Sequence, residues 1–371
     1  MNSPYESRLE GEIAAIQDDS ERASKRAELA GLWARIGEFQ RCEEVIAELR
    51  SLYGDGRNTR VSVMIMWAEA QLIYFKDLGV QARDRMSRAQ LISVASRDAS
   101  LSALTSAWLA HIDFNLHRHQ EMSRALKVSL DTVSKADHLA SCRLALTLGD
   151  AYFAAGDETR GRRWYSKAHE HAVKLGDHAS IGALTYNRAA LRVFLTRIAR
   201  VKVGEDLEVD LNLLNGEIRS AANYQAVAGL SSLQDLLGNA RASILILQQD
   251  FVAASKAIAD LLERSPRISA SDRNTNLMCD LVLCLSKSDR KSEAARRLDL
   301  LDLAAIQACT PDDQVLAYGS LEKACIELGL ERRASEFRLM LADSVNALEN
   351  EVRDLRTLLS MFDSDEYLNR I

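Results

Sequence analysis

Residues 148–157 read LGDAYFAAGD, a stretch in which a glycine interrupts an apolar helical run and a Gly-Asp pair follows it. The Gly-Asp pair supplies a helix stop and then the N-cap of the next helix. Gly149 has no side chain, so an antiparallel neighbour can approach closely there and a large aromatic residue can fill the gap. The stretch therefore predicts two packed helices joined by a turn at Gly156 and Asp157.

This unit recurs along the chain. An aspartate opens each of three similar segments at intervals of 39 and 40 residues, and a small residue follows twelve positions later: Asp98 and Ala110, Asp137 and Gly149, Asp177 and Ala189. A fixed period of this size is typical of stacked repeats, in which each helical pair buries its apolar face against its neighbours. The sequence therefore predicts about eight antiparallel helix pairs.

Composition also favours an all-α chain. Only 3 of the 371 residues are proline and 17 are glycine, while good helix formers dominate. No alternating run of Val, Ile and Thr is long enough to propose a sheet. The four tryptophans recur at core positions of the helical pattern and are predicted to fill space between helices.

The charge pattern bears on the class of partner. The net charge is −6, with acidic and basic residues interleaved, so no nucleic-acid partner is expected. We expect the densest basic run to lie on a solvated helix face; it consists of Arg192, Arg197, Arg200 and Lys202. No run approaches 18 apolar residues, so no membrane partner is expected either.

Cysteine usage and the N-terminus suggest a cytoplasmic protein. None of the six cysteines forms a C-x-x-C pair, and most lie among apolar helical residues, as free thiols in a reducing compartment do. The first residues have neither a basic segment nor an apolar segment of the signal-peptide kind.

The Leu-Gly-x-x-Tyr and Gly-Asp elements of residues 148–157 resemble the tetratricopeptide repeat family. The spacing of 39–40 residues, and the turn at residues 174–177, are similar to a longer variant found in bacterial regulators. The resemblance covers residues 20–345 and is strongest over 95–195, whereas residues 199–225 depart from the pattern and predict an irregular pair or a long helix. It implies a right-handed superhelical solenoid over residues 1–345.

The resemblance also implies a concave groove lined by the first helix of each pair. Its groove positions flank the mid-helix small residue and correspond here to His111, Phe114, Asn115, Arg143, Thr147, Asp150, Phe153, Tyr186, Asn187 and Val193. Asparagine can donate to and accept from a peptide backbone at once, and arginine can hold a carboxylate through two bonds. Asn187 and Arg143 are the preferred ligand contacts. The alternative is that these positions are ordinary solvent-exposed residues of a helix face.

The C-terminal segment 335–363 has a different pattern. Its apolar residues step by four and three: Leu341, Val345, Leu348, Val352, Leu355, Leu359 and Phe362. This heptad predicts either a homodimer seam formed by Val345, Leu348, Val352, Leu355 and Leu359, or a helix that caps the last repeat. Residues 364–371 are expected to fray.

Sequence motifs for catalysis and cofactor binding are absent. The chain has no phosphate-binding loop, no G-x-G-x-x-G, no H-E-x-x-H and no G-x-S-x-G, so we predict neither an enzyme nor a cofactor. His117 and His119, like His169 and His171, are two residues apart and would point in different directions on a helix. No metal site is therefore predicted.

The sequence leaves two functions open. One is a non-enzymatic scaffold or regulator that binds a protein or peptide partner in the groove. The other is a sensor of a peptide or metabolite, in which filling the groove changes the shape of the superhelix and so controls a partner protein.

Overall fold

The computed structural model describes the chain apart from residues 1–2, 55, 78–80, 205–206, 265–272 and 364. The described residues form helices joined by short connections, and no strand occurs among them. The all-α prediction is therefore confirmed. None of the described helices is both long enough and apolar enough to cross a membrane.

The chain divides into two compact units, a division that the single predicted array over residues 1–345 did not anticipate. Unit 1 comprises Met1–Thr185, Asn223–Ser232 and Leu355–Ile371, and unit 2 comprises Tyr186–Ala222 and Leu233–Asp354. The first boundary falls inside α10 (His178–Val203), a helix of 26 residues. This helix is longer than those of the preceding pairs.

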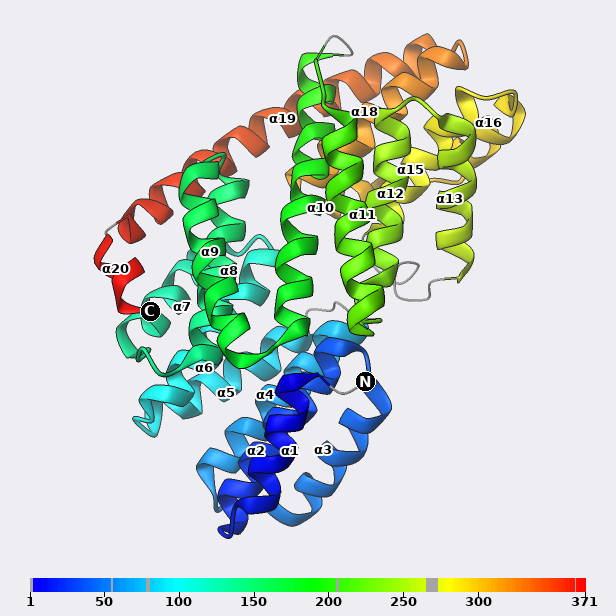
Figure 1. Ribbon diagram of the computed structural model, residues 1–371. Helices are drawn as coiled ribbons and strands as arrows, with labels where there is room; N and C mark the ends of the chain where they lie inside the picture. The colour runs from blue at the N-terminus through cyan, green and yellow to red at the C-terminus, as the bar shows by residue number, and fades with distance from the viewer. Residues whose placement is uncertain (1–2, 55, 78–80, 205–206, 265–272, 364) are drawn as a thin grey trace. The chain divides into compact units, whose positions relative to one another are not determined.

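Unit 1 contains α1 (Pro4–Ala15) and four helix pairs. The pairs are α2 (Asp19–Ile36) with α3 (Phe39–Tyr53), α4 (Thr59–Asp77) with α5 (Gln81–Ala95), α6 (Ala99–Asn115) with α7 (His119–Thr132), and α8 (His138–Ala154) with α9 (Glu158–Leu175). The helices of each pair contact each other, and the first helices also pack together, α2 on α4 and α6 on α8. Figure 1 shows α8 and α9 running side by side.

Unit 2 holds most or all of four further pairs. These are α10 with α11 (Leu211–Ala228), α12 (Gln234–Leu247) with α13 (Phe251–Arg264), α15 (Arg273–Ser286) with α16 (Lys291–Asp299), and α18 (Pro311–Glu327) with α19 (Glu331–Leu359). A short helix, α17 (Leu303–Ala308), precedes α18. The described chain thus contains eight pairs, the predicted number. The irregular region 199–225 holds the end of the long α10 and most of α11.

The Gly-Asp turns end one helix and begin the next, as predicted. Gly156 has φ 80° and Gly176 has φ 69°, a left-handed conformation that glycine adopts without strain. Asp157 then accepts a hydrogen bond from the backbone N–H of Arg160 at 3.0 Å. Asp177 accepts one from the N–H of Ser180 at 3.1 Å. These bonds satisfy amide groups that the first turn of a helix leaves without a partner.

Gly149 lies at a close approach between α8 and α9. A Cβ atom added there would lie 2.8 Å from Cδ1 of Tyr165, well inside van der Waals contact. Reciprocally, Gly161 of α9 faces the ring of Phe153 on α8. Each glycine therefore accommodates an aromatic ring from the other helix, which is the packing inferred from residues 148–157.

The C-terminal heptad stripe packs on the chain itself. Val345 and Leu348 are half-buried against Ile198, Val315 and Leu316 in unit 2. In unit 1, Leu355 and Leu359 are 2 % and 1 % exposed, and the Tyr152 hydroxyl donates to the Leu359 carbonyl at 3.1 Å. Val352 is half-buried. This burial favours the capping alternative, because Leu355 and Leu359 are not available to a second chain.

The segment 364–371, for which the sequence predicts fraying, is described from Asp365 onward. Asp365–Arg370 form α20, and Ile371 is only 6 % exposed. The Arg370 guanidinium donates to the Leu130 carbonyl at 3.4 Å, and Lys167 Nζ donates to the Ile371 carbonyl at 3.4 Å. These contacts, made across more than 200 residues of chain, hold the end against α7 and α9.

Replacing Gly149 with Leu should destabilise the protein by about 1–3 kcal/mol, because the new side chain must displace the Tyr165 ring. The control is Gly216→Leu in α11, where an added Cβ has nothing within 4 Å, so that only the gain in helix propensity remains. Urea unfolding followed by circular dichroism measures both variants. Equal stability of the two would show that the α8–α9 contact is wrong.

Candidate functional site

The first helices of unit 1 carry buried polar side chains. In α6 every residue from Leu101 to Asp113 is buried, and in α8 every residue from Ala140 to Phe153 is buried. These helices contact their own partners and also each other, which leaves no solvated face over those lengths. Polar residues on them are therefore removed from water and need partners within the protein.

Arg143 of α8 is the centre of one such group. It is 4 % exposed, and its guanidinium lies over the ring of Trp108 of α6, 3.7 Å from the ring centre. Stacking on an aromatic face stabilises the cation but does not neutralise it. Burial, together with the positive charge of Arg35, lowers the pKa of Arg143 to about 10, so the side chain remains charged at neutral pH.

His111 and Tyr74 extend the group along α6 and α4. The Trp108 ring meets the His111 ring edge to face at 5.8 Å, and Tyr74 Oη lies 3.3 Å from His111 Nε2. Burial, and secondarily the charge of Arg143, lowers the pKa of His111 well below its ordinary value. His111 is therefore neutral at pH 7 and contributes a polar ring without adding charge.

Arg35 and Asp177 complete the group, which we call the Arg143 cluster: Arg35, Tyr74, Trp108, His111, Arg143 and Asp177. Arg35 is 4 % exposed, and its Nη2 lies 3.2 Å from Oδ2 of Asp177, which is fully buried. Asp177 also accepts a hydrogen bond from the Ser180 hydroxyl at 2.8 Å. Ser232 Oγ donates to the Arg35 carbonyl at 2.5 Å and holds the end of α2 in place.

The cluster thus contains two cationic side chains and one carboxylate, which is paired with Arg35. In the part of the chain that the structure describes, no carboxylate forms an ion pair with Arg143, and Nε and Nη2 of Arg35 make no hydrogen bond. Burying a cation without a counterion is costly, and most proteins avoid it. The cluster therefore carries one uncompensated positive charge.

Unit 2 contains a buried arginine that is paired with a carboxylate. Arg197 of α10 donates to both carboxylate oxygens of Asp280 of α15, at 2.8 and 2.7 Å, and to Ser243 Oγ at 3.2 Å. Ser320 donates to the same carboxylate at 2.8 Å. Burial alone would lower the pKa of Arg197, but Asp280 raises it above the ordinary value. The expectation that Arg197 lies on a solvated face is therefore wrong.

The other predicted groove residues have varied surroundings. Thr147 is fully buried and donates to the Arg143 carbonyl at 2.9 Å, while Asn115 donates to the His111 carbonyl at 2.8 Å. Asp150 is buried and accepts a hydrogen bond from the Tyr165 hydroxyl. Tyr186, which donates to the Leu236 carbonyl at 3.4 Å, and the half-buried Asn187 both belong to unit 2.

The remaining three positions pack against other side chains. Phe114 meets the His119 ring at 6.3 Å, Phe153 meets the Tyr165 ring at 5.2 Å, and Val193 is part of a buried core in unit 2. Of the ten predicted positions, only His111 and Arg143 come together in the Arg143 cluster. Its other members, Arg35, Tyr74, Trp108 and Asp177, were not predicted as groove residues.

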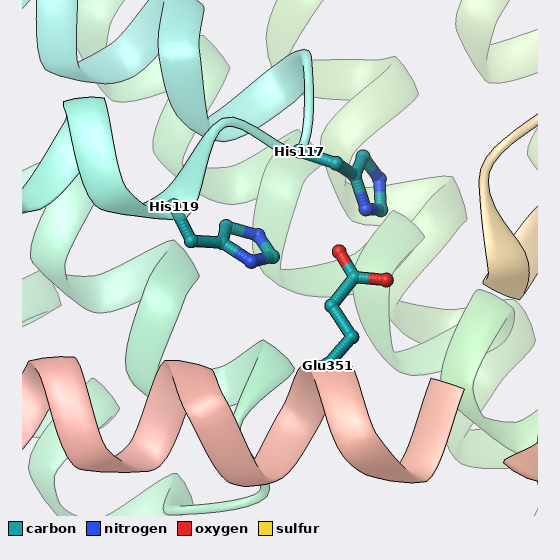
Figure 2. A group of neighbouring side chains, drawn as sticks. All are labelled: His117, His119 and Glu351. Carbon is teal, nitrogen blue, oxygen red and sulfur yellow. The ribbon is translucent and has the colours of Figure 1, made fainter. Parts of the chain in front are cut away.

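The two histidine pairs behave differently from each other. His117 has φ 55° and precedes α7, and its ring lies 5.6 Å from that of His119. Figure 2 shows both rings on one side of this turn, so the helical argument that they diverge is wrong; the third residue drawn, Glu351, belongs to unit 2. On α9 the argument holds, since His169 is exposed while His171 is buried against His138.

Comparison with known proteins adds little. No family model matches the sequence, and no curated protein matches it. Among solved structures, the TPR domain of P58(IPK) is similar over 97% of this chain and 89% of that chain, with 13% sequence identity and a TM-score of 0.34. A likeness of this size supports no conclusion about function.

Acidification should destabilise the protein through His171. Its Nδ1 lies 3.0 Å from Nδ1 of His138, and burial, followed by the His138 charge, lowers its pKa to about 4. Since the unfolded value is about 6.5, stability should be full above pH 6.5 and fall by about 1–2 kcal/mol between pH 7 and pH 5. Urea unfolding at both pH values should show a smaller fall for His171→Leu; an equal fall would assign the effect elsewhere.

Arg143 and Arg197 should respond in opposite ways to substitution by Met. Removing Arg197 leaves Asp280 buried without its cation and should cost about 3–5 kcal/mol. Removing Arg143 leaves no such charge, so Arg143→Met should stay within about 1 kcal/mol of wild type or gain stability. Urea unfolding measures both. A large loss for Arg143→Met would mean that Arg143 is a structural cation with a compensating partner.

Proposed function

We propose that this protein is a non-enzymatic binding scaffold that holds a protein or peptide partner on the first helices of its repeats. Arg143 carries the proposal, because it is a buried cation on one of these helices and no described residue forms an ion pair with it. Polar groups that a fold leaves without partners often mark a functional site. The resemblance of residues 95–195 to the longer tetratricopeptide variant supports a regulatory role for such binding.

The chemistry of the Arg143 cluster suits a peptide better than an apolar ligand. Two guanidinium groups offer several N–H donors in fixed planes, and neutral His111 offers a further polar ring. Peptides present carbonyl oxygens, carboxylates and hydroxyl groups that accept such bonds. The absence of catalytic motifs from the sequence supports a binding role over catalysis.

A sensor of a small peptide or metabolite is the second candidate. It is favoured by the burial of Arg143, which is only 4 % exposed, because a ligand that reaches this residue must separate or enter the packed helices. Such entry would shift one helical pair against the next. Measuring the hydrodynamic radius with and without the small-molecule fraction of a cell extract discriminates the two candidates: a change would support the sensor.

The partner should depend on Arg143. Wild type, Arg143→Met and Arg162→Met would each be used to retain proteins and peptides from the native cell for identification by mass spectrometry. Arg162 is the control because it lies on the second helix α9 with its side chain 63% exposed. We expect the partner to be held by wild type and the control and reduced at least about tenfold by Arg143→Met. Equal retention by all three would place binding elsewhere.

A further inference from the structure

The first three helices of unit 1 enclose a cleft. Both α1 and α3 pack on α2, and a cavity of about 210 Å³ is lined by all three helices. The lining consists of two residues of α1, three of α2 and one of α3: Glu10, Ile13, Arg26, Leu29, Trp33 and Val45. All of them belong to unit 1, so the cleft lies within one compact unit.

The α2 residues of the cleft share one side of that helix. Arg26, Leu29 and Trp33 are three and four residues apart, a spacing that aligns side chains along one helix face. Arg35, a member of the Arg143 cluster, is two residues beyond Trp33 and therefore points in a different direction. The cleft is thus separate from the Arg143 cluster, and a ligand bound there goes beyond the proposed function.

Apolar side chains make up most of the lining. Leu29 and Trp33 are 6 % and 7 % exposed, while Ile13 and Val45 are half-buried. The Trp33 indole is fixed at its edge, because its Nε1 donates to the buried Glu6 carboxylate at 2.8 Å. The cleft therefore presents one oriented aromatic ring and three aliphatic side chains to a molecule that enters it.

The two charged residues that line the cleft have opposite signs, and both are paired. Arg26 donates to both carboxylate oxygens of Glu48 of α3, at 2.7 and 2.5 Å. Glu10 lies 4.0 Å from the Arg41 guanidinium of α3, which also donates to Glu6 at 3.0 Å. A charged ligand would lose water against apolar walls, and the lining residues carry no net charge to attract it. The cleft therefore favours an uncharged ligand.

We propose that this cleft binds a small uncharged apolar molecule, of the size of one aromatic ring with a short substituent. An apolar protein cavity of about 150 Å³ binds benzene, whereas pockets for drug-sized ligands have volumes of about 300–1,000 Å³. The volume of this cleft, about 210 Å³, lies between these limits. A bound ring would cover Leu29 and Trp33, and removing this apolar surface from water supplies the driving force.

Toluene, benzylammonium and benzoate are matched probes, because they share one ring and differ in charge. Each would be titrated into wild type at neutral pH and constant ionic strength, with binding read by the thermal midpoint and by tryptophan fluorescence. Trp33 lines the cleft and supplies the fluorescence signal, whereas the other three tryptophans are at most 2 % exposed: Trp67, Trp108 and Trp164. We expect a saturable response to toluene and at least about tenfold weaker binding of both charged probes.

Two variants of α3 test the location of the site. Val45→Phe places a larger side chain in the cleft and should weaken toluene binding at least about tenfold. Leu52→Phe is the control, because Leu52 is on the same helix, is 63 % exposed and does not line the cleft. This variant should bind toluene as wild type does.

Three results would overturn the proposal. The first is a wild type that does not respond to toluene, or that responds equally to toluene and to a charged probe; this comparison needs no variant and so does not depend on variant folding. The second is equal toluene binding by wild type and Val45→Phe. The third is a wild-type dimer in sedimentation that Val45→Phe converts to a monomer, which would assign the cleft to a second copy of the chain.

Discussion

The structure of unit 1 depends on one constraint: a single helical pair cannot bury the apolar surface of its first helix. The first helices therefore pack against one another as well as against their partners, and α6 and α8 lose solvent on every side. Close approach requires small residues at the contacts, as at Gly149 beneath the Tyr165 ring. The same enclosure makes it costly in free energy to bury a polar side chain on these helices unless it finds a hydrogen-bond partner.

Several of these buried polar groups have partners that the fold supplies. Asp113 accepts a hydrogen bond from Arg83 at 2.5 Å, Asp150 accepts one from Tyr165, and Thr147 bonds its own helix. Such hydrogen bonds offset part of the free-energy cost of removing these groups from water. Arg143 differs, because its protein contact is a ring face that has no negative charge to offer.

The sequence predicts local packing well and distant pairing poorly. Gly149 and the Gly-Asp turns identify helix pairs because their effect lies within one repeat. The heptad at 341–362 fits a dimer seam and a cap equally, since both require the same apolar stripe. Arg143 was identified, but Asp177 appears in the sequence only as a turn residue, and Arg35 lies in an ordinary helical run. Arg197 resembled a solvated residue because its partner, Asp280, is 83 residues away.

Arg143 and Arg197 show how differently the fold can surround two buried arginines. Both are buried arginines on the first helices of pairs, yet Arg197 holds a carboxylate by two bonds, whereas no described carboxylate pairs with Arg143. A cation–π contact contributes about 0.5–2 kcal/mol, whereas removing a charge from water costs several kcal/mol even after relaxation. Trp108 therefore offsets only part of the cost of Arg143. The remainder is a free-energy cost that no described residue offsets with a negative charge, and in this respect Arg143 differs from Arg197.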